Sequence, residues 1–200
     1  MMLRLISKFA LSALLAIALW CGVVLPSVAQ VSDGEQSAVA VEAAPAEDLE
    51  SLSDLRDKAF TATNAGDFAA AEGYWSKILQ QRPDNPAVWS NRGNSRVSQN
   101  KLDEAIADYA KAIELAPDAP DPYLNRGAAL EGVGRWDEAI ADYDRVLELD
   151  PNDPAAYNNR GNAKGGRGDW EGAIADFKKA SELAPDFAFA YGNYAIALYQ

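Results

Sequence analysis

Asparagine side chains recur along this chain at a fixed spacing, and their chemistry suits the binding of another polypeptide. Each amide offers two hydrogen-bond donors and an acceptor without a net charge, a set that pairs with the backbone of an extended or helical peptide. A row of such amides would bind a peptide without transforming it. Four of them lie 34 positions apart and two more follow three positions later: Asn91, Asn125, Asn159 and Asn193, then Asn94 and Asn162.

Groups that could perform catalysis or hold a metal are scarce. The chain contains no His, and its one Cys, Cys21, lies near the N-terminus. The motifs H-E-x-x-H, G-x-x-x-x-G-K-[ST] and G-x-S-x-G are missing, so the common bases, nucleophiles and phosphate-binding loops are not available. The glycine-rich run from Gly165 to Gly168 resembles a phosphate loop in composition, but it falls on an expected turn between helices and no strand precedes it. We therefore expect no enzymatic activity, no cofactor and no metal site.

The charge balance narrows the class of partner. The chain has 30 acidic and 18 basic residues and a formal net charge of -12. Binding to nucleic acid or to anionic lipid requires clustered Lys and Arg, so neither is expected as a partner. A basic or neutral protein partner remains open, and so does the alternative that the acidity only keeps the protein soluble.

The asparagine spacing belongs to a longer repeat, which must position the side chains. Prolines 83, 117, 151 and 185 recur at the same interval, so residues 52–85, 86–119, 120–153 and 154–187 form four copies and 188–200 begin a fifth. A unit of this length buries its apolar face against its neighbours. We number the positions of each copy from its first residue. Bulky residues then occupy position 4 and small residues position 8, as in Trp89 and Gly93. Alanine at position 20 precedes an aromatic side chain at position 24, namely Trp75, Tyr109, Tyr143 and Phe177.

Each copy is expected to contain two helices separated by a turn. Position 15 carries Gly66, Asn100, Gly134 and Gly168, residue types that accept the left-handed conformation between helices. The spacing of the apolar positions predicts first helices over 53–65, 87–99, 121–133 and 155–167. It predicts second helices over 68–81, 102–115, 136–149 and 170–183.

Two charged positions vary together along the repeats. Position 7 is Arg92, Arg126 and Arg160 where position 23 is Asp108, Asp142 and Asp176, whereas the first repeat has neither Arg nor Asp at these positions. In antiparallel helices joined near position 15, residues 7 and 23 lie at about the same level, which predicts an ion pair within each repeat. The alternative is that each arginine reaches into a groove to meet a carboxylate of a ligand.

The pattern W/Y-x-x-x-G, then A-x-x-x-Y/F-x-x-A and a closing proline, resembles the tetratricopeptide repeat family over residues 52–200. This resemblance implies an all-α, right-handed α-α superhelix with four full helix-turn-helix repeats and the first helix of a fifth. The stretches 89–93 and 121–127 are also similar to tetratricopeptide proteins of the chloroplast thylakoid lumen and their cyanobacterial relatives.

The resemblance implies that the first helices line a concave groove, where the asparagines would meet a peptide. It also supplies a structural alternative, because position-6 asparagines in this family often bond to the neighbouring repeat. That alternative does not cover Asn94 and Asn162 at position 9, which we expect to be the stronger groove residues. Some relatives clamp a C-terminal carboxylate with basic residues at positions 2, 5 and 6 of successive repeats. Here only Arg56, at position 5 of the first repeat, is basic, so this clamp is absent and recognition through backbone and apolar side chains is favoured.

The N-terminus is typical of an export signal. Arg4 and Lys8 precede an uncharged apolar run, and Ser27 and Ala29 provide the small residues of a cleavage site, so residues 1–29 are predicted to be a signal peptide cleaved after Ala29. The alternative is an uncleaved anchor, the one case in which we expect membrane contact. Residues 30–51 are expected to be a disordered, acidic and Ala-rich linker. We predict localisation in a thylakoid lumen or a periplasm.

These observations predict an exported scaffold that binds a peptide or helix of a partner protein. The resemblance to lumenal proteins implies a role in assembling or maintaining a membrane complex, in particular a photosynthetic one. Two alternatives of different classes remain. In one, the repeats are the targeting arm of a longer enzyme with its catalytic region beyond residue 200. In the other, they form a structural module that associates with itself through the final helix.

Overall fold

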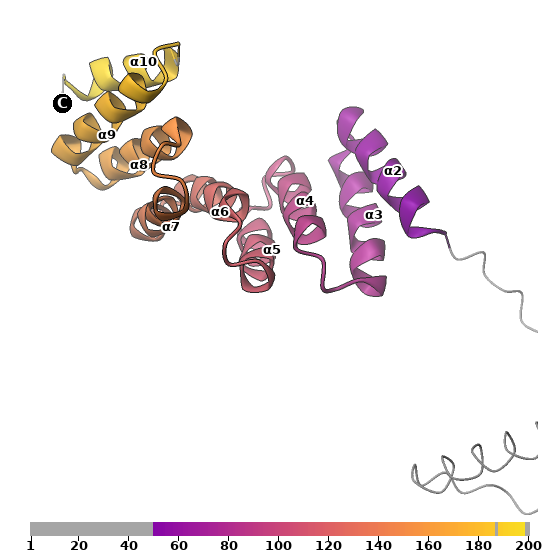
Figure 1. The fold of residues 1–200 in the computed structure, drawn as a ribbon. Coiled ribbons are helices and arrows are strands. Elements are labelled where there is room, and N and C mark those ends of the chain that lie inside the picture. Colours follow the sequence, from indigo (N-terminus) through magenta and orange to yellow (C-terminus); the bar gives the residue numbers. More distant parts are fainter. Residues whose placement is uncertain (1–49, 187, 199–200) are drawn as a thin grey trace, which may run out of the picture. The chain divides into compact units, whose positions relative to one another are not determined.

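The computed structural model describes residues 50–186 and 188–198, and all regular secondary structure in these ranges is helical (Figure 1). The predicted signal peptide lies outside the described residues, as does the linker except for Glu50 and Ser51. The first helices of the repeats are α2 (Leu52–Asn64), α4 (Pro86–Val97), α6 (Pro120–Gly132), α8 (Pro154–Arg167) and α10 (Ala188–Ala197). The second helices are α3 (Phe68–Gln81), α5 (Leu102–Leu115), α7 (Trp136–Leu149) and α9 (Trp170–Leu183).

The second helices have the predicted bounds, whereas the first helices are shifted at their ends. Each first helix of the four full repeats begins one residue earlier than predicted, at a proline in the second, third and fourth repeats. Proline suits this place because it has no backbone N–H to leave unsatisfied and its φ matches a helix. The side chain of Asn85 completes the start of α4 by accepting a hydrogen bond from the N–H of Ala87 at 3.1 Å. The first helices of the first three repeats also end one or two residues early.

The turn inside each repeat contains one residue in the left-handed conformation, as predicted. The φ angles are 76° at Gly66, 60° at Asn100, 76° at Gly134 and 91° at Gly168. This conformation places the N–H groups that follow each first helix against its last carbonyls. The turn then reverses the chain so that the second helix packs antiparallel to the first.

The core of each repeat is an aromatic ring seated on a residue without a large side chain. A Cβ added to Gly127 would lie 2.6 Å from the ring of Tyr143, which is fully buried. Glycine is therefore required at position 8 by close packing. The same relation joins Gly93 to Tyr109 and Gly161 to Phe177, while the first repeat uses Ala59 and Trp75.

The aromatic residue at position 4 has a different role from the one at position 24. In the second, third and fourth repeats these side chains are half-buried, and each donates a hydrogen bond to the carbonyl of the proline six residues earlier. The indole Nε1 of Trp89 donates to the Pro83 carbonyl at 2.8 Å, and the Tyr123 hydroxyl donates to that of Pro117 at 3.2 Å. Position 4 thus fixes the loop between repeats.

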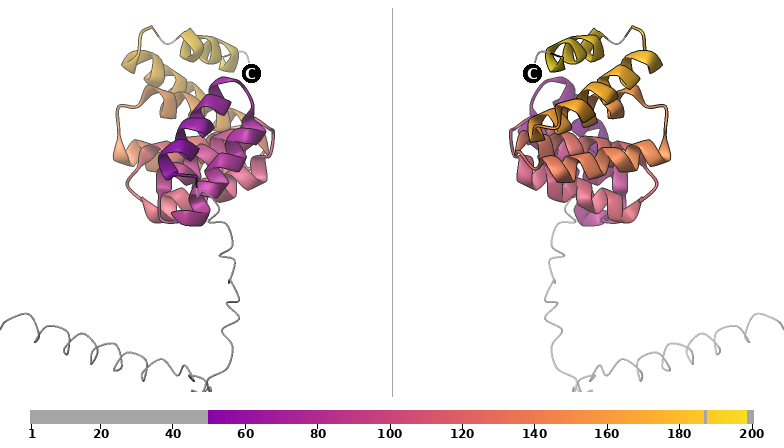
Figure 2. Two further views of the ribbon diagram at one scale, coloured as in Figure 1. Left: turned by 90° about the vertical axis from the view of Figure 1, so that its right-hand side faces the viewer. Right: turned by 90° about the vertical axis from the view of Figure 1, so that its left-hand side faces the viewer.

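Successive helices pack against one another in chain order (Figures 1 and 2). In addition, first helices of successive repeats touch, α4 with α6, α6 with α8 and α8 with α10. No contact of this extent joins the second helices of successive repeats in the part of the chain described. The first helices therefore form the inner row of the array, as the family resemblance implied. None of the described helices is both long and apolar enough for a bilayer span.

The last helix departs from the expected packing. Ala195 holds position 8 of the fifth copy but is exposed, whereas its counterparts in the four full repeats are buried. The residue of α10 that packs against Phe177 and Ala173 is Ala197, which is 3% exposed. The reason is that, within the described residues, no second helix follows α10 to cover position 8. The side chains of Tyr191, Ile196 and Leu198 are exposed as well.

Candidate peptide-binding groove

The predicted asparagines all lie on the inner row of helices, but their amides have different surroundings. Asn91 on α4 and Asn125 on α6 are half-buried and make no side-chain hydrogen bond among the residues that the structure describes. The amide oxygen of Asn159 accepts a hydrogen bond from Asn158 at 3.2 Å. Asn91 and Asn125 therefore keep the donors and acceptor that a peptide backbone requires.

Asn94 and Asn162, which we expected to be the stronger groove residues, both make side-chain hydrogen bonds within the array. The hydroxyl of Tyr109 donates to Oδ1 of Asn94 at 2.7 Å, because position 9 lies beside the ring at position 24 of the same repeat. In the fourth repeat position 24 is Phe177, which has no hydroxyl. There Oδ1 of Asn162 accepts instead from Nδ2 of Asn193 at 3.1 Å. Both oxygens are thus committed to the array.

Asn193 confirms the structural alternative for position 6 at one site only. Its Nδ2 also donates to Oδ1 of Asn158 at 3.0 Å, so one amide of α10 bonds to two residues of α8. The earlier position-6 residues lack this arrangement. Ser90 and Leu124 stand where Asn158 stands in the fourth repeat, and no bond to the preceding repeat forms from Asn125 or Asn159.

The predicted pairing of positions 7 and 23 is confirmed in three repeats. Nε and Nη2 of Arg126 donate to the two carboxylate oxygens of Asp142 at 2.8 and 2.6 Å. The hydrogen bonds that Arg126 donates to Asp142 raise the pKa of Arg126, and desolvation opposes the shift. Each guanidinium also lies near the aromatic ring at position 4, at 4.8 Å from the ring centre in Arg92 with Trp89. The other two pairs are Arg92 with Asp108 and Arg160 with Asp176.

At the first interface between repeats the ion pair becomes a network. Arg96 donates from Nη1 to Asp108 at 2.8 Å and from Nε to Glu72 of the preceding repeat at 2.9 Å. Lys101 also contacts Glu72, at 2.7 Å. Although desolvation raises it, the hydrogen bonds from Lys101, Arg96 and Gln99 lower the pKa of Glu72 to about 2. These charges hold α3, α4 and α5 together and are not directed at a ligand.

A carboxyl group on the inner row, outside these pairs, bonds to one of the buried tyrosines. Glu131 on α6 is half-buried and accepts a hydrogen bond from the hydroxyl of Tyr143 at 2.5 Å. Burial raises the pKa of Glu131, and the bond from Tyr143 opposes the shift. Position 12 carries no other acid in the four full repeats, so the residue could have been noticed from the repeat alignment.

The glycine-rich run of the fourth repeat has a packing role. A Cβ on Gly166 would lie 2.8 Å from the ring of Trp136, and one on Gly165 would lie 3.0 Å from that of Trp170. Both glycines belong to the last turn of α8, and only Gly168 lies on the turn itself. They give two indole rings room to approach the helix. Among the described residues, no cluster of His, Cys, Asp or Glu could hold a metal ion.

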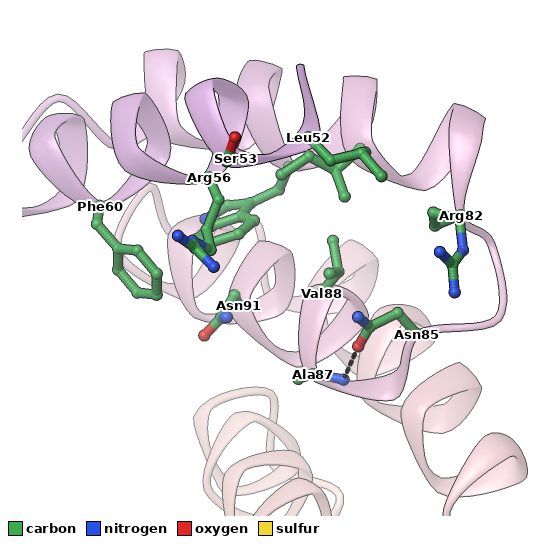
Figure 3. Close-up of a pocket in the computed structure, with 11 residues that line it drawn as sticks. Leu52, Ser53, Arg56, Phe60, Arg82, Asn85, Ala87, Val88 and Asn91 are labelled. Carbon is green, nitrogen blue, oxygen red and sulfur yellow. Dashed lines mark hydrogen bonds between the residues drawn. The ribbon is translucent and has the colours of Figure 1, made fainter.

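A cavity of about 400 Å³ opens between α2 and α4 at the start of the inner row (Figure 3). We call it the first-interface pocket. Figure 3 shows Arg56 pointing down from α2 toward α4, where Asn91 lies at the opposite edge. The pocket was not predicted, although arginine occurs at positions 5 and 31 in the first repeat alone. Its lining is Leu52, Ser53, Arg56, Phe60, Trp75, Ile78, Arg82, Asn85, Ala87, Val88 and Asn91.

Comparison with known structures identifies proteins of the same fold. The MamA protein is 22% identical and superposes with a TM-score of 0.69 over 74% of this chain and 81% of its own. YrrB, described as a TPR protein with an unusual peptide-binding site, is 21% identical with a TM-score of 0.67, covering 72% of this chain and 75% of its own. The first TPR of Spaghetti (RPAP3), bound to the HSP90 peptide SRMEEVD, is 27% identical with a TM-score of 0.56, covering 57% of this chain and 91% of its own.

Family models match the central and later repeats directly. The model described as TPR repeat matches residues 93–134 and 133–165, and the model described as Tetratricopeptide repeat matches residues 154–187. No curated protein matches the chain. The unmatched first repeat has the same two helices, left-handed turn and aromatic core as those that follow. The chain therefore contains tetratricopeptide repeats.

Proposed function

We propose that this protein is an exported scaffold that binds a peptide or helix of a partner protein along the inner row of first helices. The observation that carries the proposal is the pair of half-buried amides, Asn91 and Asn125, at the same position of successive helices. Neither makes a side-chain hydrogen bond within the described part of the chain. Both amides are partly exposed, so each can exchange hydrogen bonds with water for hydrogen bonds with the backbone of a ligand.

The ligand chemistry follows from these amides. An asparagine can donate to a backbone carbonyl and accept from a backbone N–H of the same peptide. Such contacts recognise a polypeptide without demanding a particular side chain, and specificity then comes from pockets beside them. Two of the solved structures similar to this chain are described with a bound peptide or a peptide-binding site. Their likeness supports a peptide as the class of ligand.

The cellular part of the proposal rests on the N-terminal sequence. Residues 1–29 have the basic start, apolar run and small-residue cleavage site of a signal peptide. We infer that the protein acts in a thylakoid lumen or a periplasm, where it assists the assembly or maintenance of a membrane complex. Mass spectrometry of the protein purified from its host tests the first step, since a chain that retains residues 1–29 would contradict cleavage.

A capture experiment tests the groove. The full-length protein and its double variant Asn91→Ala, Asn125→Ala are used as bait for the host's exported fraction. We expect the variant to lose the bound protein, because both amides contribute contacts and neither supports the fold. Asn152→Ala is the matched control, since its exposed amide lies on a loop outside the inner row. Equal capture by wild type and the double variant would show that the inner row is not the binding site.

A second candidate function is self-association through α10. The specific observation is the exposure of Tyr191 and Ile196, at 48% and 60%, on a helix without charged residues, together with that of Leu198, at 58%, directly after the helix. Exposed apolar patches often mark interfaces. Sedimentation at increasing protein concentration, with Ile196→Asp and Leu198→Asp together as the comparison, tests this candidate. A sedimentation coefficient independent of concentration in the wild type would exclude it.

A further inference from the structure

The first-interface pocket is lined by two arginines whose positions carry no arginine in the later repeats. Arg56 holds position 5 of its repeat, where later repeats carry Ser90, Leu124 and Asn158. Arg82 holds position 31, where later repeats carry Ala116, Asp150 and Ala184. Because the helices themselves repeat without these arginines, the fold does not require them. Their place beside a cavity points to a ligand.

The two arginines are also paired more weakly than the structural ones. Arg56 contacts Asp57 at 3.1 Å and Arg82 contacts Asp84 at 3.3 Å, and in both pairs the arginine side chain is 58% exposed. Exposed ion pairs between such neighbours contribute little, so either guanidinium can exchange its partner readily. The arginine of each structural pair is by contrast mostly buried and donates two hydrogen bonds to one aspartate.

The walls of the pocket are apolar beneath these charges. Phe60 is 46% exposed and packs edge-on against Trp75, with the ring centres 5.1 Å apart. Leu52, Ile78 and Val88 complete the apolar part of the lining. A cavity of about 400 Å³ lies within the range of small ligand sites and can take one large side chain. Figure 3 shows Leu52 and Val88 on opposite sides of this space.

We propose that the first-interface pocket binds an internal acidic segment of a partner protein. A bulky apolar side chain of that segment enters the cavity, and a neighbouring carboxylate accepts hydrogen bonds from Arg56 or Arg82. This inference rests on the proposed function, because it assigns a chemistry to one end of the same groove. The choice of an acidic partner follows from charge complementarity with the two exposed guanidinium groups.

The net negative charge of the chain does not oppose this choice at close range. The first repeat contains five acids and four bases, whereas the third contains nine acids and three bases. At physiological salt, charges more than about 8 Å apart are largely screened, so an incoming carboxylate responds mainly to the nearest arginines. The pocket therefore offers an acidic segment a locally favourable site on an acidic protein.

An NMR titration with short peptides tests the proposal on the full-length protein. The probe is a peptide of glycine and serine with a central Leu-Asp-Glu, acetylated and amidated so that it has no terminal charge. We expect shifts at the amides of Arg56, Phe60 and Asn91. Replacing the acids by Asn and Gln should weaken binding roughly tenfold, the usual effect of losing a hydrogen bond to a charged group. Replacing Leu by Ala should weaken it by a similar factor, roughly tenfold.

Variants of the protein provide the matched comparison. Arg56→Gln combined with Arg82→Gln should reduce the affinity for the acidic probe roughly tenfold and leave that for the Asn-Gln probe unchanged. Arg145→Gln is the control, because Arg145 is a partly exposed arginine on α7, outside the pocket, that pairs with Asp118 and Glu148. The amide spectrum of each variant shows whether its fold is retained. Equal binding of the acidic and neutral probes to the wild type would overturn the proposal.

Two further outcomes distinguish this inference from binding of the chain's own linker and from the proposed scaffold function. If neutralising three acids of the linker, by Glu42→Gln, Glu47→Gln and Asp48→Asn, tightens binding of the probe more than tenfold, the pocket belongs to this chain's own linker, and the partner proposal is wrong. If the arginine variants capture the exported partner normally while the Asn91 and Asn125 double variant does not, the scaffold function stands and the acidic specificity fails.

Discussion

Arg92 and Asp108 meet at two points across α4 and α5. Nη2 of the arginine donates to Oδ1 at 2.7 Å and Nε donates to Oδ2 at 2.9 Å, while the aspartate side chain is only 2% exposed. The parallel geometry of the guanidinium and carboxylate makes such a pair both strong and directional. Since it recurs in three successive repeats, it sets the level at which each pair of helices packs.

The pair of Arg126 with Asp142 has no further ionic partner in the described structure, so it should show how much stability is lost when one partner is removed. We expect Asp142→Ala to lower the free energy of unfolding by about 2 kcal/mol, because it leaves a mostly buried guanidinium without its carboxylate. Replacing both residues by leucine should cost less than the single change. Urea unfolding followed by circular dichroism measures both variants.

The exposed pair of Arg135 and Glu138 is the control for that cycle. Glu138→Ala should leave the free energy of unfolding almost unchanged, since both side chains face solvent. If Asp142→Ala were no more harmful than Glu138→Ala, the pair at positions 7 and 23 would have no structural role.

Gly127 should tolerate no side chain. Gly127→Ala places a methyl group against the buried ring of Tyr143, so we expect a loss of about 1–3 kcal/mol in the free energy of unfolding. Gly73→Ala in α3 is the matched control, because no other group lies within 4 Å of its added Cβ. That change should stabilise the protein by about 0.5–1 kcal/mol through helix propensity. Destabilisation of equal size by both changes would argue against close packing of Tyr143 on Gly127.

Glu72 should make the stability sensitive to acid. Its folded pKa lies at about 2, below the ordinary value of 4.5, so its ionised form stabilises the fold above pH 4.5. This contribution is lost as the pH falls from 4.5 toward 2. We therefore expect Glu72→Gln to be less stable than wild type at neutral pH, with a difference that shrinks over this range. Urea titrations at several pH values measure it, and a difference that stays constant with pH would refute the assignment.

The contribution of Glu131 to stability should depend on pH in the opposite direction. Burial raises its folded pKa above the ordinary value of 4.5, so the folded state holds the proton more tightly than the unfolded state. The free energy of unfolding should then fall as the pH rises from 4.5 through the raised pKa. Glu131→Gln removes this pH-dependent loss and keeps an acceptor for the Tyr143 hydroxyl. The free energy of unfolding of the variant should therefore rise relative to that of the wild type as the pH rises. Glu148→Gln, at an exposed carboxylate, should show no such gain.

Much of the fold could be predicted from the sequence because each repeat has the same pattern of residue types at the same positions. Helix periodicity and the register of two antiparallel helices determine the place of Gly134 in the turn and of the Tyr143 ring in the core. They also determine that Arg126 lies opposite Asp142. These relations lie within one repeat, and four copies in one chain stand in for an alignment. Consequently the second helices, the turns and the ion pairs were all predicted at the residues where the structure has them.

Which asparagines remain open to a ligand was decided by the tertiary structure. Asn94 and Asn162 have equal positions in the repeat, yet one accepts from Tyr109 of its own repeat and the other from Asn193 of the next. A hydrogen bond requires a donor–acceptor distance within a few tenths of an ångström, and here the two partners come from different helices. Residue type and spacing therefore do not determine which bond each asparagine makes. The same holds for the first-interface pocket, whose walls meet only when α2 and α4 are packed together.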